Sequence, residues 1–202
     1  MTRVVLASGN AKKLAELRRI LEPLVPGVEV LGLRDVEPYD EPAETEPTFE
    51  GNALIKARAA VAATGLPALA DDSGLCVDAL NGMPGVLSAR WAGVAKDDAA
   101  NNRLLLAQLA DVPDERRTAT FRCVMAFVRP DGTEIVQSGE MPGRILRDER
   151  GEGGFGYDPL FAADGYDVST AELSREEKDA ISHRGKALRA IAPRVAEALR
   201  RS

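Results

Sequence analysis

The sequence predicts an α/β protein, and three observations carry that prediction. Residues 4–7 are an apolar run of the kind that forms a short buried strand. Turn-forming residues 8–10 follow, and from residue 11 to residue 21 the apolar positions recur with helical spacing. Later in the chain, residues 118–128 and 133–139 predict two antiparallel strands joined by a Pro-Asp-Gly turn.

The composition is typical of a globular protein, with 45% hydrophobic and 29% charged residues in 202. This length predicts one or at most two domains with a substantial core, and we expect residues 1–202 to form a single one. A net charge of −6 argues against a nucleic-acid partner, which needs a broad basic surface, but allows a small phosphate pocket. No signal peptide or membrane-spanning run is visible, so we expect a cytoplasmic protein without a membrane partner. Cys76 and Cys123 each lie in an apolar run, which favours buried free thiols.

The turn at residues 8–10 leads into a predicted helix N-terminus, a place that favours anion binding. The first N–H groups of a helix lack partners within the helix, and the helix dipole is positive there. Lys12 and Lys13 lie in this first turn, where a cation is unfavourable unless an anion arrives. An ordinary strand–turn–helix unit with solvated lysines also explains the stretch, so it does not decide the function alone.

The middle of the chain continues the alternation of strands and helices. Residues 28–33 predict a second strand, and residues 35–47, rich in acids and proline, predict a surface loop. Thr48 is placed to cap a second helix that ends at Gly65. A third helix is expected after a cap at Asp97 or Asp98.

Two adjacent carboxylates, Asp71 and Asp72, interrupt a buried segment between the apolar runs 68–70 and 75–77. In an extended chain neighbouring side chains point to opposite faces, so only one of the two can address a given site. A polar turn is one interpretation. The other is a metal-binding or general-base carboxylate at a strand end, where ligand sites of α/β proteins collect.

Residues 144–150 predict a polar connection, and the glycine-rich residues 151–156 that follow fit G-x-G-x-x-G. We reject a dinucleotide loop because no strand precedes the glycines and an extended run, residues 157–161, follows in place of a helix. Phe155 lies among these glycines. Its ring can stack on a base from an exposed loop, or it can be buried in the core.

The last stretch begins with a capping box at residues 174–177, which predicts a helix start with Lys178 just after it. The glycine that follows Arg184 is a poor residue for a helix interior, so we expect a break there with Ser182 as a new cap. His183 and Arg184 lie beside that break. A lone histidine is usually structural or solvated, but an adjacent arginine and helix end favour a binding role.

Together these features are the parts of a nucleotide site: a phosphate loop, a carboxylate, an aromatic residue on a glycine loop, and basic residues near a helix end. The sequence has no serine or cysteine nucleophile with a matching base, and no zinc ligand set. Metal-assisted attack of water on a phosphoanhydride is therefore the predicted chemistry. The alternative is a non-catalytic sensor with the same pocket, which would release no pyrophosphate.

The chain resembles the non-standard purine NTP pyrophosphatases, the inosine triphosphate pyrophosphatase family. The resemblance covers essentially the whole chain and rests on five motifs in order, a combination far more specific than any one of them. The motifs are Ser8-Gly9-Asn10-x-x-Lys13-x-x-Glu16, Thr48-Phe49-x-x-Asn52-Ala53-x-x-Lys56-Ala57, Ala70-Asp71-Asp72-Ser73-Gly74-Leu75, Gly153-Gly154-Phe155-Gly156-Tyr157-Asp158-Pro159, and Glu177-Lys178-x-x-Ile181-Ser182-His183-Arg184-Gly185. The implied activity is hydrolysis of ITP, dITP and XTP to the monophosphate and pyrophosphate with Mg²⁺, which removes deaminated purines from the nucleotide pool.

The resemblance also implies a role for each matching residue. Asp72 is the implied proton acceptor for water and a metal ligand. The implied phosphate contacts are Ser8, Gly9, Asn10, Ala11, Lys12, Lys13 and Lys178. Further implied substrate contacts are Lys56, Ser73, Phe155, Gly156, Tyr157, Asp158, His183 and Arg184. Of these, Phe155 is expected to stack on the base, and His183 and Arg184 to lie at its 6-oxo edge.

The second metal ligand is the one departure from the family pattern. Relatives place a metal-binding glutamate in the acidic loop before Thr48, and some carry two adjacent glutamates, whereas here the pair is Ala43-Glu44. Glu44 is the best candidate, with Glu41 behind it. The resemblance further implies an α/β fold with a long mixed sheet, helices at its sides, a nucleotide cleft between two lobes, and a homodimer.

Overall fold

The structure, a computed structural model, describes residues 2–93 and 97–200. Its strands form a mixed sheet in the order β2-β1-β3-β5-β6-β7, with β4 paired to β3. The strands are β1 (Arg3–Leu6), β2 (Glu29–Leu31), β3 (Ala68–Val77), β4 (Met83–Pro84), β5 (Thr118–Val128), β6 (Glu134–Ile145) and β7 (Phe161–Ala163). The β1–β2 and β1–β3 pairs are parallel, while β3–β4 and β6–β7 are antiparallel. The predicted α/β class with a mixed sheet is therefore confirmed.

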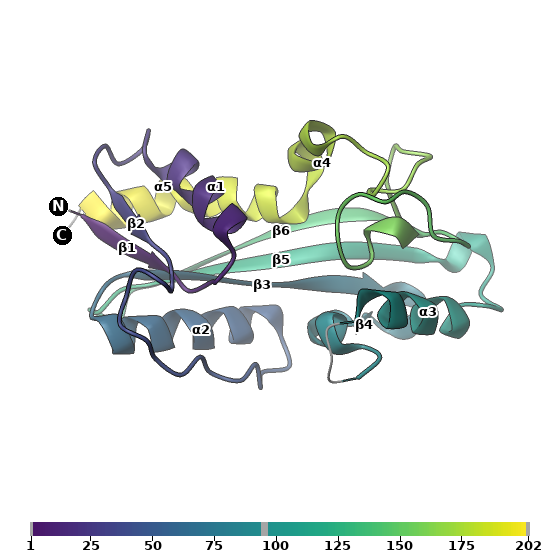
Figure 1. Cartoon of the computed structure of the whole chain (residues 1–202), viewed down its shortest axis with the longest axis horizontal. Helices are drawn as coiled ribbons and strands as arrows, with labels where there is room; N and C mark the ends of the chain where they lie inside the picture. The colour runs from purple at the N-terminus through teal and green to yellow at the C-terminus, as the bar shows by residue number, and fades with distance from the viewer. Residues whose placement is uncertain (1, 94–96, 201–202) are drawn as a thin grey trace. The chain divides into compact units, whose positions relative to one another are not determined.

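Five α-helices accompany these strands in the described part of the chain (Figure 1). They are α1 (Ala11–Leu21), α2 (Phe49–Thr64), α3 (Asp98–Gln108), α4 (Arg175–Ile181) and α5 (His183–Arg200). None of the helices in residues 2–93 and 97–200 combines the length and hydrophobicity that a bilayer crossing requires. The chain divides into two compact units: unit 1 is Met1–Asp72, Cys123–Gly139 and Lys186–Ser202, and unit 2 is Ser73–Arg122 and Glu140–Gly185.

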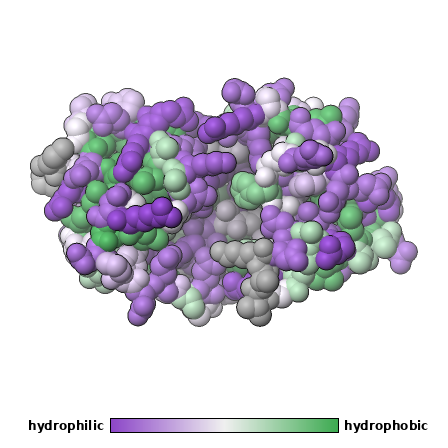
Figure 2. Space-filling view, in the orientation of Figure 1, coloured by the Kyte–Doolittle hydropathy of each residue, from purple (hydrophilic) through white to green (hydrophobic). Residues whose placement is uncertain are grey.

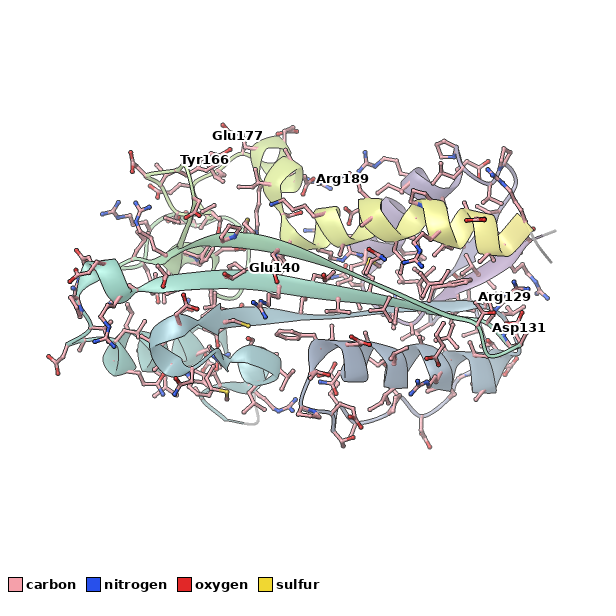
Figure 3. The ribbon with its side chains drawn as sticks, turned by 180° about the vertical axis from the view of Figure 1, so that it is seen from behind. Arg129, Asp131, Glu140, Tyr166, Glu177 and Arg189 are labelled. Carbon is pink, nitrogen blue, oxygen red and sulfur yellow. The ribbon has the colours of Figure 1, made fainter. Side chains whose placement is uncertain are left out.

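In unit 1, α1 and α5 cover one face of the strands and α2 covers the other (Figure 1). The alternation of side chains along each strand explains this division. Val4, Leu6 and Leu69 join the core with α1 and α5, whereas Val5 and Ala70 pack in the clusters that include α2. Alanines on the buried face of α2 let that helix approach the sheet closely. Arg129 and Asp131, also in unit 1, form an ion pair at the turn between β5 and β6 (Figure 3).

Unit 2 has its own core. It is built from the unit 2 portions of β3, β5 and β6 together with α3 and the segment around β7. Leu105 and Leu109 are fully buried, and Asp97 rather than Asp98 caps α3. Arg117 is buried and donates to the carbonyl oxygens of Leu109, Ile145 and Leu146. This guanidinium thereby ties the end of α3 to the end of β6.

Four predicted segments differ from the structure in their extent. The strand expected at 28–33 is the shorter β2, and the strand expected at 133–139 continues as β6 to Ile145, so the polar connection at 144–150 starts later. The continuation is possible because glycine at 143 leaves room for β7: a Cβ there would lie 2.2 Å from the carbonyl oxygen of Ala162. The run at 157–161 is extended only at its end, since Asp158–Leu160 forms a 3₁₀ turn.

Other predictions from the sequence are confirmed. Thr48 and Ser174 cap α2 and α4, and Glu177 completes the capping box at the start of α4 (Figure 3). The oxygen of Ser182 accepts from the backbone N–H of residue 185, so the expected break between the last two helices is present. The face drawn in Figure 2 is mostly hydrophilic. Neither cysteine forms a disulfide; Cys123 is buried as expected, whereas Cys76 is only half-buried.

Candidate active site

Asp71 and Asp72 lie in the middle of β3, so the polar turn that the sequence left open is wrong, and so is the expected strand end. The strand continues because each buried carboxylate has a partner, which offsets the cost of removing its charge from water. As expected for adjacent residues of a strand, their side chains contact different elements. Asp71 pairs with Lys13 of α1, and Asp72 faces α2. Both residues are buried.

Lys13 is fixed by Asp71. Its Nζ lies 2.6 Å from Oδ2 of Asp71, whose side chain is 1% exposed, while the lysine side chain is 27% exposed. The turn before it is closed by Asn10, whose Oδ1 accepts from the N–H groups of Lys12 and Lys13 at 2.9 and 3.3 Å. Ser8 accepts from the N–H of Asn10. Two N–H groups that the sequence left for an anion are therefore occupied by the cap, and the charges of this turn are those of the exposed Lys12 and of Lys13, which is paired with Asp71.

Asp72 is held by two residues one turn apart on α2. Nδ2 of the buried Asn52 donates to Oδ2 of Asp72 at 3.1 Å, and Nζ of Lys56 lies 3.9 Å from Oδ1. Oδ1 of Asn52 in turn accepts from the N–H of Glu46 in the acidic loop, which fixes the amide. Lys56 also pairs with Glu44 at 2.7 Å. A loop acid, two helix residues and a strand carboxylate thus converge in unit 1.

The carboxylates of Glu44 and Asp72 fit a divalent metal ion. One cationic group, the Lys56 ammonium, already lies within reach of both. No group of three or more His, Cys, Asp and Glu side chains suited to a metal occurs within residues 2–93 and 97–200. Mg²⁺ is usually bound through one or two carboxylates together with phosphate oxygens and water. The pair therefore suits an ion that is shared with a phosphate ligand.

In unit 2 the glycine loop presents Phe155 to solvent, with 79% of the residue exposed. The core alternative for this ring is therefore wrong. Asp158 organises the loop: its Oδ2 accepts from the N–H of Phe155 at 2.7 Å and pairs with Lys178, and its Oδ1 accepts from Thr170. Nζ of Lys178 also lies 5.0 Å from the centre of the Phe155 ring. The backbone that carries the exposed ring is thus held by a buried carboxylate.

Tyr157 anchors the loop rather than extending from it. It is buried, and its hydroxyl donates to the carbonyl oxygen of Ser88 at 2.8 Å. Burial raises the pKa of this hydroxyl and the nearby Asp98 carboxylate raises it further, so it stays protonated. A 3₁₀ turn at Asp158–Leu160 and then β7, rather than an α-helix, come next after the glycines, in agreement with the rejection of a dinucleotide loop.

His183 and Arg184 begin α5 and are both half-buried. The imidazole stacks on Phe121, with ring centres 5.0 Å apart and planes 12° apart, and Phe121 makes an edge contact with Phe161. The core of unit 2 therefore sets the plane of the imidazole. Ser73 follows Asp72 on β3 and is half-buried.

The structure brings some of the expected residues together and leaves others apart. In unit 1 Lys13 pairs with Asp71, whereas Glu44 and Lys56 lie with Asp72; in unit 2 Lys178 joins the Phe155–Asp158 loop. Among the described residues, Ser73, His183 and Arg184 take no part in these contacts. The resemblance assigned no role to Asn52 or to Asp71. The signal for Asn52 was available: an asparagine and a lysine four positions apart in an alanine-rich helix must lie on one side of it.

The sequence matches the Ham1 family over residues 4–194. The chain belongs to this family. A dITP/XTP pyrophosphatase of Nocardia farcinica is 66% identical over 197 residues, which cover 97% of this Ham1-family chain and 96% of the relative. One from Corynebacterium glutamicum is 58% identical over 200 residues, covering 96% and 97%.

Solved structures agree with this assignment. A nucleoside-triphosphatase / dITP/XTP pyrophosphatase of Mycobacterium abscessus matches with a TM-score of 0.84 and 57% identity, covering 95% of this chain and all of that one. The Ham1 protein of Staphylococcus aureus matches with a TM-score of 0.90 and 39% identity, covering 98% and 100%. The mixed sheet with flanking helices is therefore the fold of the Ham1 family.

Proposed function

We propose that the protein hydrolyses non-standard purine nucleoside triphosphates (dITP, XTP and ITP) to the nucleoside monophosphate and pyrophosphate. The observation that carries the proposal is the setting of Asp72. This buried carboxylate accepts a hydrogen bond from Asn52, and the Lys56 ammonium lies within reach of both Asp72 and Glu44. A fixed carboxylate of this kind can accept a proton from an attacking water. The printed names of the relatives from Nocardia and Corynebacterium support the same activity.

The unit 1 residues supply the phosphate chemistry in this proposal. Lys13 and Lys56 each bring a positive charge to the phosphate groups, and Asp72 takes the proton of the water that attacks the α-phosphorus. Glu44 and Asp72 would hold Mg²⁺. The bound ion would offset the negative charge of the phosphates during the displacement. Asn52 keeps the Asp72 carboxylate in one orientation.

The unit 2 residues supply base recognition. The exposed ring of Phe155 offers a face on which a purine can stack. His183 and Arg184 bring N–H donors, which suit the 6-oxo group of hypoxanthine and xanthine. Adenine carries an amino donor at that position and would leave buried donors unpaired, at about 1–3 kcal/mol each. Guanine shares the 6-oxo group, so its rejection requires a further contact.

Replacing Asp72 by asparagine tests the proposed base. The amide keeps the size and can still lie against Asn52, but it cannot take the proton. We expect turnover of dITP to fall about 10²–10⁴-fold while the nucleotide still binds. Asp111→Asn, the same change at an exposed position, is the control. Near-normal turnover in Asp72→Asn would refute the assignment.

A panel of dITP, XTP, ITP, GTP and ATP with product identification tests the reaction itself. Pyrophosphate release from the first three would establish cleavage between the α- and β-phosphates. Orthophosphate would contradict the proposal, and nucleotide binding without any product would favour the non-catalytic sensor.

We also propose that residues 1–202 act as one pyrophosphatase domain and that two copies form a homodimer. The family match over residues 4–194, which includes sequence from both units, supports the first statement. The second rests on the resemblance to the inosine triphosphate pyrophosphatases. Light scattering on the protein eluted from a size-exclusion column would test the homodimer, and the mass of a single chain would contradict it.

A further inference from the structure

We propose that Asp98 and Asn102 of α3 are positioning residues that fix the Phe155 loop for the nucleotide base. This inference rests on the proposed function and extends it, because neither residue belongs to the motifs that carry the resemblance. All the contacts involved lie within unit 2.

The loop needs external support because of its own composition. Residues 151, 154 and 156 are glycines with φ of +79°, +74° and +61°. Glycines lose more conformational freedom on ordering than other residues, so such a loop is costly to hold in one conformation. The exposed Phe155 ring packs little core surface that could compensate. Polar contacts must therefore define where the ring lies.

Two side chains of α3 hold the peptide groups of Gly156. Oδ2 of Asp98 accepts from the N–H of Gly156 at 2.7 Å, and Nδ2 of Asn102 donates to its carbonyl oxygen at 3.2 Å. The two residues are four positions apart, so they lie on one side of the helix. Two side chains one turn apart on α3 thus hydrogen-bond to the N–H and the carbonyl oxygen of a single loop residue.

The burial of Asn102 indicates why an amide stands there. The residue is 3% exposed, and no donor among the described residues reaches its buried Oδ1. A buried acceptor without a partner is unfavourable, and an apolar side chain would avoid that cost. The contact that an apolar residue could not make is the one to Gly156. The neighbouring Asn101 also hydrogen-bonds to a backbone group outside α3, since its Oδ1 accepts from the N–H of Ala92.

The α3 contacts complement those of Asp158. The N–H of Phe155 is taken by Asp158, and the next peptide in the chain is taken by α3. Phe155 is therefore fixed on both sides while its ring stays exposed. A loop held in its binding conformation before the ligand arrives loses less entropy on binding, which improves affinity.

The test compares matched substitutions at both positions. Asp98→Ala removes the acceptor for the Gly156 N–H, whereas Asp98→Asn keeps an oxygen there and also removes the charge, so it controls for the helix dipole. Asn102→Asp keeps the size and removes the donor. Arg103→Ala, on the exposed side of α3, is the control for the helix itself. Two quantities are measured: hydrogen exchange of residues 153–158, and KM and kcat for pyrophosphate release from dITP.

We expect Asp98→Ala and Asn102→Asp to speed exchange in the loop and to raise KM about fivefold each, the scale of one hydrogen bond, with kcat changed less than twofold. Asp98→Asn and Arg103→Ala should resemble the wild type. If Asn102→Asp fails to fold, Asp98→Ala decides, because Asp98 is exposed.

Faster exchange with an unchanged KM would overturn the inference and leave the proposed function standing, as would unchanged exchange in Asp98→Ala. A wild-type protein that releases no pyrophosphate from any of dITP, XTP and ITP would overturn the proposed function. In that case the α3 contacts would have no role in catalysis, even if the exchange data still show that α3 holds the loop.

Discussion

Replacing Lys13 by methionine should destabilise the folded protein by about 3 kcal/mol. Methionine keeps most of the aliphatic length of the side chain but leaves the Asp71 carboxylate, 1% exposed, without the ammonium that lies 2.6 Å away. Removing one partner of a buried ion pair costs about 3–5 kcal/mol, because the other charge stays buried without its counter-ion. The lysine side chain is 27% exposed, so water can partly replace it and the lower end of this range applies.

Urea denaturation measures this loss. An unchanged slope of the unfolding free energy against urea concentration checks that the midpoint shift reflects stability alone. For a slope of about 2–3 kcal/mol per molar, the expected loss lowers the midpoint by about 1 M or more. Lys12→Met is the matched control. Its side chain is exposed, so we expect a change within about 0.5 kcal/mol.

A double-mutant cycle isolates the pair. In an Asp71→Asn background no buried charge is left behind, so Lys13→Met should cost about 1–2 kcal/mol less than it does in the wild type. An equal loss in both backgrounds would refute the reasoning and would leave Lys13 to phosphate binding alone.

Three further predictions follow from contacts described above. Glu44→Gln should raise the Mg²⁺ concentration needed for half-maximal activity, measured by metal titration with Glu41→Gln as control, and an unchanged requirement would move the metal role to another acid. Arg117→Met should destabilise the protein by about 3 kcal/mol or more in thermal unfolding, since it removes the buried guanidinium that donates to the carbonyl oxygens of Leu109, Ile145 and Leu146; a loss under about 1 kcal/mol would contradict this. Hydrogen bonds from the Ser174 hydroxyl, and to a lesser extent from the Ser174 backbone N–H, lower the pKa of Glu177 in the folded protein. The stabilisation that this carboxylate gives α4 should therefore be complete above the pKa of Glu177 in the unfolded chain. It should be lost as the pH falls through the lower pKa of Glu177 in the folded protein. An NMR titration in which Ser174→Ala leaves the pKa of Glu177 unchanged would disprove that cause.

The ends of the helices could be predicted from the sequence because they depend on residues only a few positions apart. Thr48 and Ser174 cap the helices that follow them because their oxygens accept from N–H groups three residues on. The separation of Asp71 and Asp72 to different sides followed equally from the period of an extended chain. The motifs also sufficed to indicate the family.

The continuity of β3 could not be predicted, because the partners of its two carboxylates lie far away in the sequence. Asp71 is 58 residues from Lys13, and Asp72 is 20 residues from Asn52. Without those partners a buried pair of acids favours a turn at the surface, which is why the sequence left that alternative open. The pairing of strands and the approach of α2 decide the matter.

The glycine loop shows the same division. Its composition by itself determined a flexible backbone that carries an aromatic ring and excluded a dinucleotide loop. Only the tertiary structure decided that the ring is exposed, that Asp158 and Lys178 organise it, and that α3 holds Gly156 from 58 and 54 positions away. Local periodicity and capping are fixed by neighbours in the chain, whereas these contacts exist only once separate elements pack together.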